Sequence, residues 1–248
     1  MKNSLLLFAI ILFNCSNDAV VKLKRSEISV DSAFSYPIDS TKQVLLDTSI
    51  FLFLSDVQMI NKNIRVELKY ATADNFMKIK LYERMTRAYL QKDVAIRLGK
   101  CQEYLTSLNS SLHLLVYDAV RPLSIQKKMW IALDTIPIRE RVKFVSNPAN
   151  KSIHNYGAAV DLTICNEEGQ ALDMGAGYDD MRQIAYPSLE VTFLSQGLLT
   201  KEHIANRNLL RKIMRSQRFT GIPTEWWHFN ACTRDAAAKK YKVLLEEP

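Results

Sequence analysis

From about residue 49 onward, some segments of the chain space their hydrophobic residues as a helix does, and others space them as a strand does. Within residues 88–109, apolar side chains recur at steps of three and four, at Leu90, Val94, Leu98, Cys101, Leu105 and Leu108. This spacing places them on one face and predicts an amphipathic helix. Two further helices are expected, a short one over residues 124–133 and a longer one over residues 205–216.

Four other segments are typical of strands. Residues 64–72 alternate apolar and polar side chains, which is the period of a half-buried strand. The segments 113–119, 158–164 and 224–231 are rich in apolar, β-branched or aromatic residues. Helices and strands do not alternate as regularly as in a parallel βαβ fold. We therefore expect an α+β fold with a mostly antiparallel central sheet flanked by helices.

The first residues have the pattern of an export signal. Lys2 precedes an unbroken apolar run from Leu5 to Phe13, which is far shorter than the ~20 residues that a membrane-spanning helix needs and fits the core of a signal peptide. Cys15 follows this run as in bacterial lipoprotein signals, in which the cysteine is lipidated. Asn14 stands where a small residue is usual, so simple secretion is the alternative.

These patterns divide the chain into three parts. We expect residues 1–15 to be a signal peptide of the lipoprotein type, residues 16–48 a polar tether, and residues 49–248 one folded domain. The protein would then lie in the bacterial cell envelope, in the periplasm or anchored to the membrane. Its only contact with the membrane would be a lipid on Cys15.

Composition narrows the possible partners. The chain of 248 residues is 48% hydrophobic with only seven glycines and seven prolines, which favours a folded protein over a disordered one. The formal net charge of +7 would suit an anionic partner. The basic residues are scattered, however, and no run of five or more like charges marks a binding tail. We therefore expect a solvated basic surface and no nucleic-acid partner.

The cysteines beyond Cys15 form no CxxC pair, which argues against a zinc ribbon or a thioredoxin-like redox site. They are Cys101, Cys165 and Cys232. We expect small reduced residues of the core. A disulfide between Cys165 and Cys232 is the alternative.

Two of the four histidines stand near carboxylates. His154 in "SIHNYGAAVD" is followed seven positions later by Asp161, and His228 in "EWWHF" follows Glu225 by three positions. A catalytic zinc site uses three protein ligands and keeps one position open, and a metallohydrolase also needs a carboxylate to accept a proton. Each motif alone could equally be structural, as a turn before a strand or as an aromatic core strand.

A common site imposes two conditions on the backbone. Glu225 and His228 would point to opposite faces of a regular strand, so Glu225 must lie at an irregular start of the strand, which Pro223 makes plausible. Gly157 must provide a turn that brings His154 back over Asp161.

The two motifs together resemble the paired signature of the D-alanyl-D-alanine dipeptidases, the VanX-like family of zinc peptidases. Further blocks agree in order and spacing: "RVELKYATADNF" (65–76), "YDAVRP" (117–122), "LDMGAGYDD" (172–180) and "NRNLLRKIM" (206–214). The resemblance runs from the first predicted strand to the last and leaves out only the signal and tether. It implies the fold of zinc D-Ala-D-Ala peptidases.

The resemblance implies one zinc ion per chain. His154, Asp161 and His228 match the metal ligands of the family, and Glu225 matches its general base. Arg121 matches an arginine that stabilises the oxyanion of the tetrahedral intermediate.

Further matched positions concern substrate binding. Asp118 matches an acidic position that orients the arginine, and Ser152 matches a position near the substrate carboxylate. Asp173 matches an acidic position expected to receive the substrate ammonium group. Tyr70 is a candidate for the pocket wall, with a purely structural core tyrosine as the alternative.

The implied reaction is hydrolysis of the dipeptide D-Ala-D-Ala to two D-alanines by a metal-activated water, in cell-wall peptide turnover or recycling. The alternatives are a D,D-carboxypeptidase or endopeptidase acting on peptidoglycan peptides, and a wall-binding module without catalysis. The sequence departs from the family at two places: Arg218 stands where glycine is common, and Tyr178 stands where phenylalanine is frequent.

Overall fold

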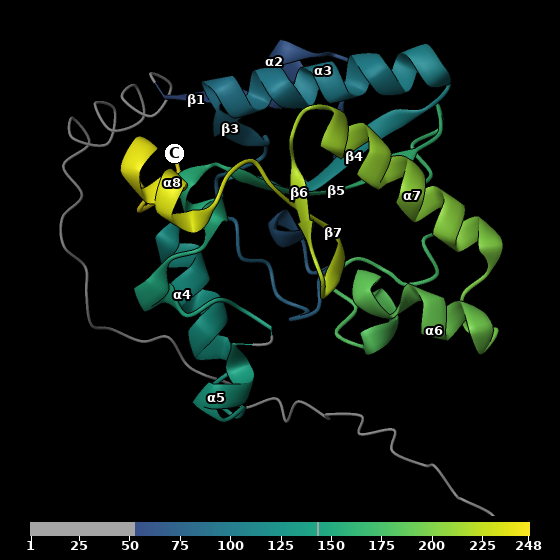
Figure 1. The fold of residues 1–248 in the computed structure, drawn as a ribbon. Helices are drawn as coiled ribbons and strands as arrows, with labels where there is room; N and C mark the ends of the chain where they lie inside the picture. Colours follow the sequence, from purple (N-terminus) through teal and green to yellow (C-terminus); the bar gives the residue numbers. More distant parts are fainter. Residues whose placement is uncertain (1–52, 143) are drawn as a thin grey trace, which may run out of the picture. The chain divides into compact units, whose positions relative to one another are not determined.

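The centre of the fold is a five-stranded sheet in the order β2-β4-β5-β7-β6 (Figure 1). Its strands are β2 (Arg65–Val66), β4 (His113–Asp118), β5 (Ala159–Cys165), β6 (Thr220–Ile222) and β7 (Glu225–Asn230). Only β2 and β4 run parallel, and the other neighbours are antiparallel. The expected mostly antiparallel α+β fold is therefore confirmed.

The structure is a computed structural model that describes residues 53–142 and 144–248. The predictions for the signal peptide, the tether and Cys15 lie outside the described residues. Within them, no helix is long and apolar enough to cross a membrane.

Two long helices pack against the sheet. They are α3 (Lys92–Leu108) and α7 (Lys201–Ser216), which also contact each other. Figure 1 shows α3 running along the top of the view and α7 descending from it. Of the apolar face predicted for this helix, Leu90 lies in β3 (Tyr89–Gln91) and Leu108 is 46% exposed at the end of the helix. The other four residues are buried in α3, with Leu98 and Leu105 fully inaccessible to solvent. Burying each such side chain contributes about 1.5–3 kcal/mol relative to exposure.

The remaining elements are short. The α-helices are α2 (Val57–Ile60), α4 (Leu123–Ala132), α5 (Ile138–Arg141), α6 (Glu190–Ser195) and α8 (Arg234–Lys240). The 3-10 helices are η1 (Lys69–Ala71), η2 (Pro148–Asn150), η3 (Ile153–Tyr156), η4 (Gln183–Ala185) and η5 (Pro187–Leu189). A small second sheet pairs β1 (Leu54–Asp56) with β3 (Tyr89–Gln91) in antiparallel fashion.

The strand expected over residues 64–72 is shorter than predicted. It ends after Val66, and η1 follows. The side-chain amide of Asn75 donates to the backbone carbonyls of Lys69, Thr72 and Ile79 and so closes a loop that interrupts the strand. The segment at η1 is therefore not part of the sheet, although it still contacts β4.

The three cysteines of the described residues are free thiols. Cys101 and Cys165 are buried, and burial raises the pKa of Cys101 to about 12. Their free state agrees with the prediction of reduced cysteines and not with the alternative of a disulfide between Cys165 and Cys232.

Candidate metal centre

The register of the central sheet places three polar side chains in one row. Asp161 on β5 lies opposite Asp118 on β4 and opposite His228 on β7. Cross-strand partners in an antiparallel sheet project to the same face. The sheet therefore brings together residues that are far apart in the sequence.

His154 reaches this row from η3, just before β5. Ser152 caps η3 with a side chain that accepts from the His154 backbone N–H, and Asn155 completes a capping box. Gly157 ends the turn in the left-handed conformation with φ of 65°, which favours glycine. The expected glycine turn between His154 and Asp161 is therefore present in the structure.

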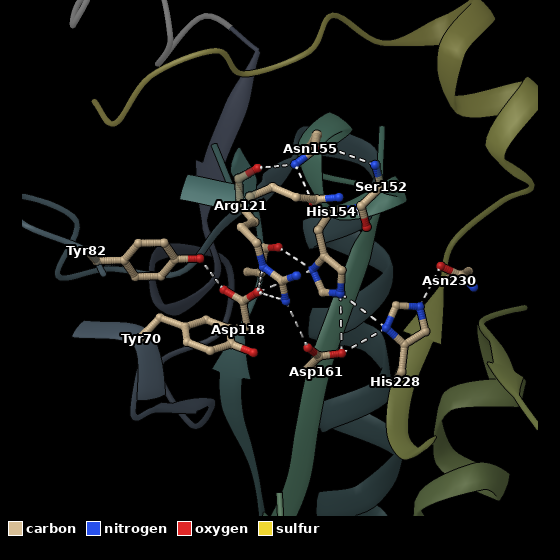
Figure 2. Close-up of polar contacts among 12 residues, drawn as sticks. Tyr70, Tyr82, Asp118, Arg121, Ser152, His154, Asn155, Asp161, His228 and Asn230 are labelled. Carbon is tan, nitrogen blue, oxygen red and sulfur yellow. Dashed lines mark hydrogen bonds and ion pairs between the residues drawn. The ribbon is translucent and has the colours of Figure 1, made fainter. Parts of the chain in front are cut away.

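Three donor atoms converge on one point. His228 Nδ1 lies 2.9 Å from Asp161 Oδ1 and 3.2 Å from His154 Nε2, while His154 Nε2 lies 3.3 Å from Asp161 Oδ1. Figure 2 shows the two rings and the carboxylate pointing toward one another. Among the described residues these three form a group able to hold a metal ion.

The outer nitrogen of each imidazole is tied to an acceptor. His154 Nδ1 donates to the Ala119 carbonyl at 2.6 Å, and His228 Nε2 donates to Asn230 Oδ1 at 2.9 Å. An N–H on the outer nitrogen leaves a lone pair on the inner one, as metal-ligating histidines require. Both rings are therefore fixed in the tautomer that binds a metal.

The spacing of the donors suits zinc. Zn–N and Zn–O bonds of ~2.0–2.2 Å at tetrahedral angles separate ligand atoms by about 3.3–3.5 Å. The observed separations of 2.9 to 3.3 Å are close to this range. Two nitrogens and one carboxylate oxygen also form a donor set that zinc accepts in catalytic sites. The side chains present fit that metal.

The electrostatics of the cluster favour a cation. Burial disfavours the charged form of His228, but the hydrogen bond and the charge of Asp161 outweigh it and raise the pKa of His228 to about 9. The Asp161 carboxyl is buried too, yet the two histidines hold its pKa well below the usual value. The metal-free cluster thus takes up a proton where a metal ion would sit.

Glu225 lies beside the cluster at the first position of β7. The register between β6 and β7 shifts between Gly221 and Ile222, so that Ile222 pairs with Glu225. This irregular start brings Glu225 Oε2 to 3.8 Å from His228 Nδ1. Burial, with the charge of Asp161 acting in the same direction, raises the pKa of the Glu225 carboxyl above its usual value.

Arg121 extends along the other side of Asp161. Its guanidinium binds the fully buried Asp118 carboxylate through Nε at 2.9 Å and Nη2 at 2.7 Å, and Nη2 lies 3.6 Å from Asp161 Oδ2. The Tyr82 hydroxyl donates to the second oxygen of Asp118 at 2.5 Å. Asp118 therefore fixes the orientation of Arg121, and its charge raises the already high pKa of the guanidinium further against the effect of burial.

One small pocket of about 190 Å³ opens onto this arrangement. The predicted site residues that line it are Tyr70, Arg121, Ser152, His154, Asp161, Glu225 and His228. In Figure 2, Tyr70 lies on one side of the metal cluster, and Ser152 and Asn230 lie on the other.

Asp173 requires a correction, because the structure does not bring it to this pocket. Its Oδ1 accepts from the Gly175 backbone N–H at 2.8 Å, and its Oδ2 lies 3.1 Å from His203 Nε2. The side chain is 74% exposed and lines a separate hollow with His203. Asp173 stabilises the turn at Gly175 and is not among the residues that line the pocket beside the metal cluster.

Asp179 occupies the pocket wall instead, and sequence reasoning missed it. The Tyr70 hydroxyl donates to its Oδ1 at 3.2 Å, while its Oδ2 is shielded from solvent and has no hydrogen-bond partner in the described part of the chain. Burial and the charge of Asp161 raise the pKa of Asp179 well above the usual value. Its backbone is left-handed, with φ of 59°, and such strain in a non-glycine residue is commonest at functional sites.

The loop that carries Asp179 is anchored from outside the site. The buried Arg207 on α7 donates to the backbone carbonyls of Met174 at 2.7 Å and Ile184 at 3.0 Å. Trp226 Nε1 donates to the Ala176 carbonyl at 3.1 Å. These bonds hold the loop on both sides of Asp179.

The site combines three metal-donor atoms around one point with the carboxyl group of Glu225 and the fixed guanidinium of Arg121. This arrangement is typical of a metal-dependent hydrolase. Residues 52–244 match peptidase family M15, described as D-Ala-D-Ala dipeptidase. The chain therefore belongs to the D-Ala-D-Ala dipeptidase family, and the resemblance seen in its sequence motifs is confirmed.

Known relatives agree over most of their length. The D-alanyl-D-alanine dipeptidase of Escherichia coli (strain K12) is 38% identical over 197 residues, which are 78% of this chain and 90% of the relative. That of Enterococcus faecalis is 31% identical over 194 residues, 72% of this chain and 90% of the relative. A solved vancomycin-resistance D,D-pentapeptidase in complex with zinc is 13% identical with a TM-score of 0.32, covering 64% of this chain and 81% of that one. A match this distant bears on no detail of the site.

Proposed function

We propose that the protein is a zinc-dependent dipeptidase that hydrolyses D-Ala-D-Ala to two D-alanines. The observation that carries this proposal is the convergence of His154 Nε2, Asp161 Oδ1 and His228 Nδ1, with both outer imidazole nitrogens tied to acceptors. These three atoms would hold one zinc ion. When bound, zinc polarises the scissile carbonyl and makes water nucleophilic at neutral pH.

Glu225 is the general base of the proposed reaction. Its carboxylate lies next to the donor cluster, and burial raises its pKa above the usual value, which makes it a stronger base than a solvated glutamate. It accepts the proton of the attacking water and delivers it to the departing amine. Losing such a group typically costs 10²–10⁴ in rate.

Arg121 offers a permanent positive charge where negative charge develops on the carbonyl oxygen. Asp118 and Tyr82 hold it in place before substrate arrives, so that no reorganisation is needed in the transition state. One donor of this kind is worth ~3–4 kcal/mol in the transition state.

The pocket also offers partners for both charged ends of a free dipeptide. Asp179 Oδ2 is a shielded acceptor that lacks a donor, and an ammonium group would supply one. Ser152 lies on the opposite side of the cluster and offers a hydroxyl to the carboxylate. Tyr70 orients Asp179 through its hydroxyl. An N-terminally extended peptide would bring an uncharged amide to Asp179 and leave that carboxylate unpaired and buried.

This charge placement favours a dipeptidase over a D,D-carboxypeptidase or endopeptidase, whose substrates have no free amine at that position. A wall-binding module without catalysis would have no use for Glu225 beside the metal donors. Rates on D-Ala-D-Ala and on a tripeptide extended at its N-terminus separate the first two functions. Comparable rates would rule out a site closed to longer peptides.

The decisive experiment incubates the purified protein with D-Ala-D-Ala and follows free D-alanine, with and without a zinc chelator. Release that stops with chelator and returns with added zinc supports the proposal. Bound zinc without release would point to longer wall peptides as substrates. Neither zinc nor release would favour the binding module.

We also propose that the protein works in the cell envelope, where D-Ala-D-Ala from wall turnover would be recycled. The support is the apolar run before Cys15 in the sequence. Cell fractionation of the native chain and a Cys15→Ser variant tests this. A membrane-bound native chain and a released variant are expected, and a native chain in the cytoplasm would contradict the proposal.

A further inference from the structure

The hydroxyl of Tyr178 adds a feature to the metal cluster that the resemblance to the family does not supply. The residue stands where the family frequently has phenylalanine, within the loop that carries Asp179. Its ring packs against Tyr117 at 4.9 Å and Trp227 at 5.4 Å between ring centroids. These contacts need only an aromatic ring, so the packing leaves the hydroxyl unexplained.

That hydroxyl has two partners, the hydroxyl of Tyr70 and the carboxylate of Asp161. Tyr178 Oη donates to Asp161 Oδ2 at 3.2 Å. The other oxygen, Oδ1, faces the two histidine nitrogens. The two oxygens of Asp161 are thereby divided between different tasks, since one faces the metal position and the other faces away from it.

Without the hydroxyl, the outer oxygen would be held only weakly. The nearest other charged group is Arg121, whose Nη2 is 3.6 Å from Oδ2 and is already engaged by Asp118 at 2.7 Å. The terminal torsion angle of a carboxylate has a broad distribution, so the group can rotate until both oxygens approach a metal. A directed donor to Oδ2 restrains this rotation.

Resting on the proposed zinc site, we infer that Tyr178 is a positioning residue that holds Asp161 as a one-oxygen ligand. The bond draws some charge from the carboxylate, which by itself would weaken metal binding. It also keeps Oδ1 in place before the metal arrives. The second effect prevails, because hydrogen bonds to ligating side chains are typically worth 10–100-fold in metal affinity. Relatives without the hydroxyl are common, so we expect the contribution of Tyr178 to metal affinity to be near tenfold, the lower limit of this range.

Tyr178→Phe tests this inference with little risk to the fold, because phenylalanine is frequent at this position in the family. The matched control is Tyr117→Phe, which removes a hydroxyl from the neighbouring ring. Among the described residues, the hydroxyl of Tyr117 forms no hydrogen bond with Asp161. Zinc affinity of the metal-free proteins is measured by competition with a chromophoric chelator.

We expect Tyr178→Phe to bind zinc about tenfold more weakly and Tyr117→Phe to bind it as the unchanged protein does. Cobalt(II) in place of zinc should give weaker visible absorption in Tyr178→Phe, since a second carboxylate oxygen raises the coordination number. An unchanged affinity for Tyr178→Phe, or an equal loss in both variants, would overturn the inference. Absence of zinc binding by the unchanged protein would instead refute the proposed function.

Discussion

The Nε2 of His154 and the Nδ1 of His228 face each other across 3.2 Å, and both rings donate from their outer nitrogens to fixed acceptors. With both outer nitrogens protonated, two neutral rings would turn lone pairs toward each other. Only a cation between them resolves this arrangement. In the metal-free protein that cation is a proton, and in the loaded protein it is the metal.

This relationship predicts how the stability of the metal-free protein depends on pH. The folded pKa of His228 is about 9, above the ~6.5 of an unfolded chain. A raised folded pKa gives stability that is fully present below pH ~6.5 and lost as the pH rises through about 9. The loss amounts to about 3 kcal/mol.

The measurement is urea unfolding of the metal-free protein and of His228→Gln across this range of pH. The difference in free energy of unfolding between the two should shrink as the pH rises. With zinc bound, His228 is already neutral and the decline should disappear. A difference that stays constant from pH 6 to 9.5 would contradict the assignment.

Removing the carboxylate of Glu225 should separate catalysis from metal binding. Glu225→Ala removes the proposed base but none of the three donor atoms. The variant should keep one zinc per chain and lose roughly 10²–10⁴ in kcat. His154→Ala should lose the metal itself. Metal analysis and D-alanine release on the same preparations check both, and a normal rate for Glu225→Ala would show that another group is the base.

A matched pair of variants tests whether Asp179, and not Asp173, is the carboxylate that binds the substrate. Asp179→Asn removes the carboxyl group that would pair with the substrate ammonium, and breaking such a pair costs ~2–5 kcal/mol. We expect kcat/KM to fall by about 30-fold or more. Asp173→Asn alters a 74% exposed side chain and should stay within about twofold of the unchanged protein.

Asp179→Asn should not lose stability, although it should lose activity. The Oδ2 of Asp179 is buried without a partner in the described structure, and burial disfavours the charged form, as the raised pKa of Asp179 shows, so a neutral amide there should not destabilise the fold. Asp179→Asn should unfold at the same or a higher urea concentration than the unchanged protein. A large loss of stability together with normal kcat/KM would mean that Asp179 is structural.

The sequence predicts the parts of the site that depend on local geometry. The spacing of His154, Gly157 and Asp161 is enough to expect a turn before a strand, because glycine is the residue that adopts the required left-handed backbone. If Glu225 and His228 serve one site, their three-residue spacing requires an irregular start of β7, because a regular strand would separate the two side chains. Both expectations concern residues within one turn or one strand.

The parts that could not be predicted depend on contacts between distant segments. In "GAGYDD", nothing local distinguishes Asp179, whose Oδ2 is shielded in the pocket without a partner, from Asp180, which binds the exposed Arg182. The choice is made by Arg207, which anchors the loop from α7. Likewise, the partner of Tyr178 becomes visible only when the loop folds back over β5.

Arg218, which stands where the family commonly has glycine, allows a prediction about stability: replacing it with glycine should stabilise the fold. Arg218 follows the end of α7 with φ of 60°, and a left-handed conformation costs ~1–2 kcal/mol in a residue with a side chain. Glycine avoids this cost but gives the unfolded chain more freedom, worth ~0.4–1 kcal/mol. Arg218→Gly should therefore raise the free energy of unfolding by about 0.5–1 kcal/mol.

The control is Arg215→Gly, three residues earlier and inside α7, which should lower the free energy of unfolding by about 1 kcal/mol. Urea unfolding of the zinc-loaded proteins measures both, and a loss of stability in Arg218→Gly would show that the arginine side chain contributes more than its strained backbone costs.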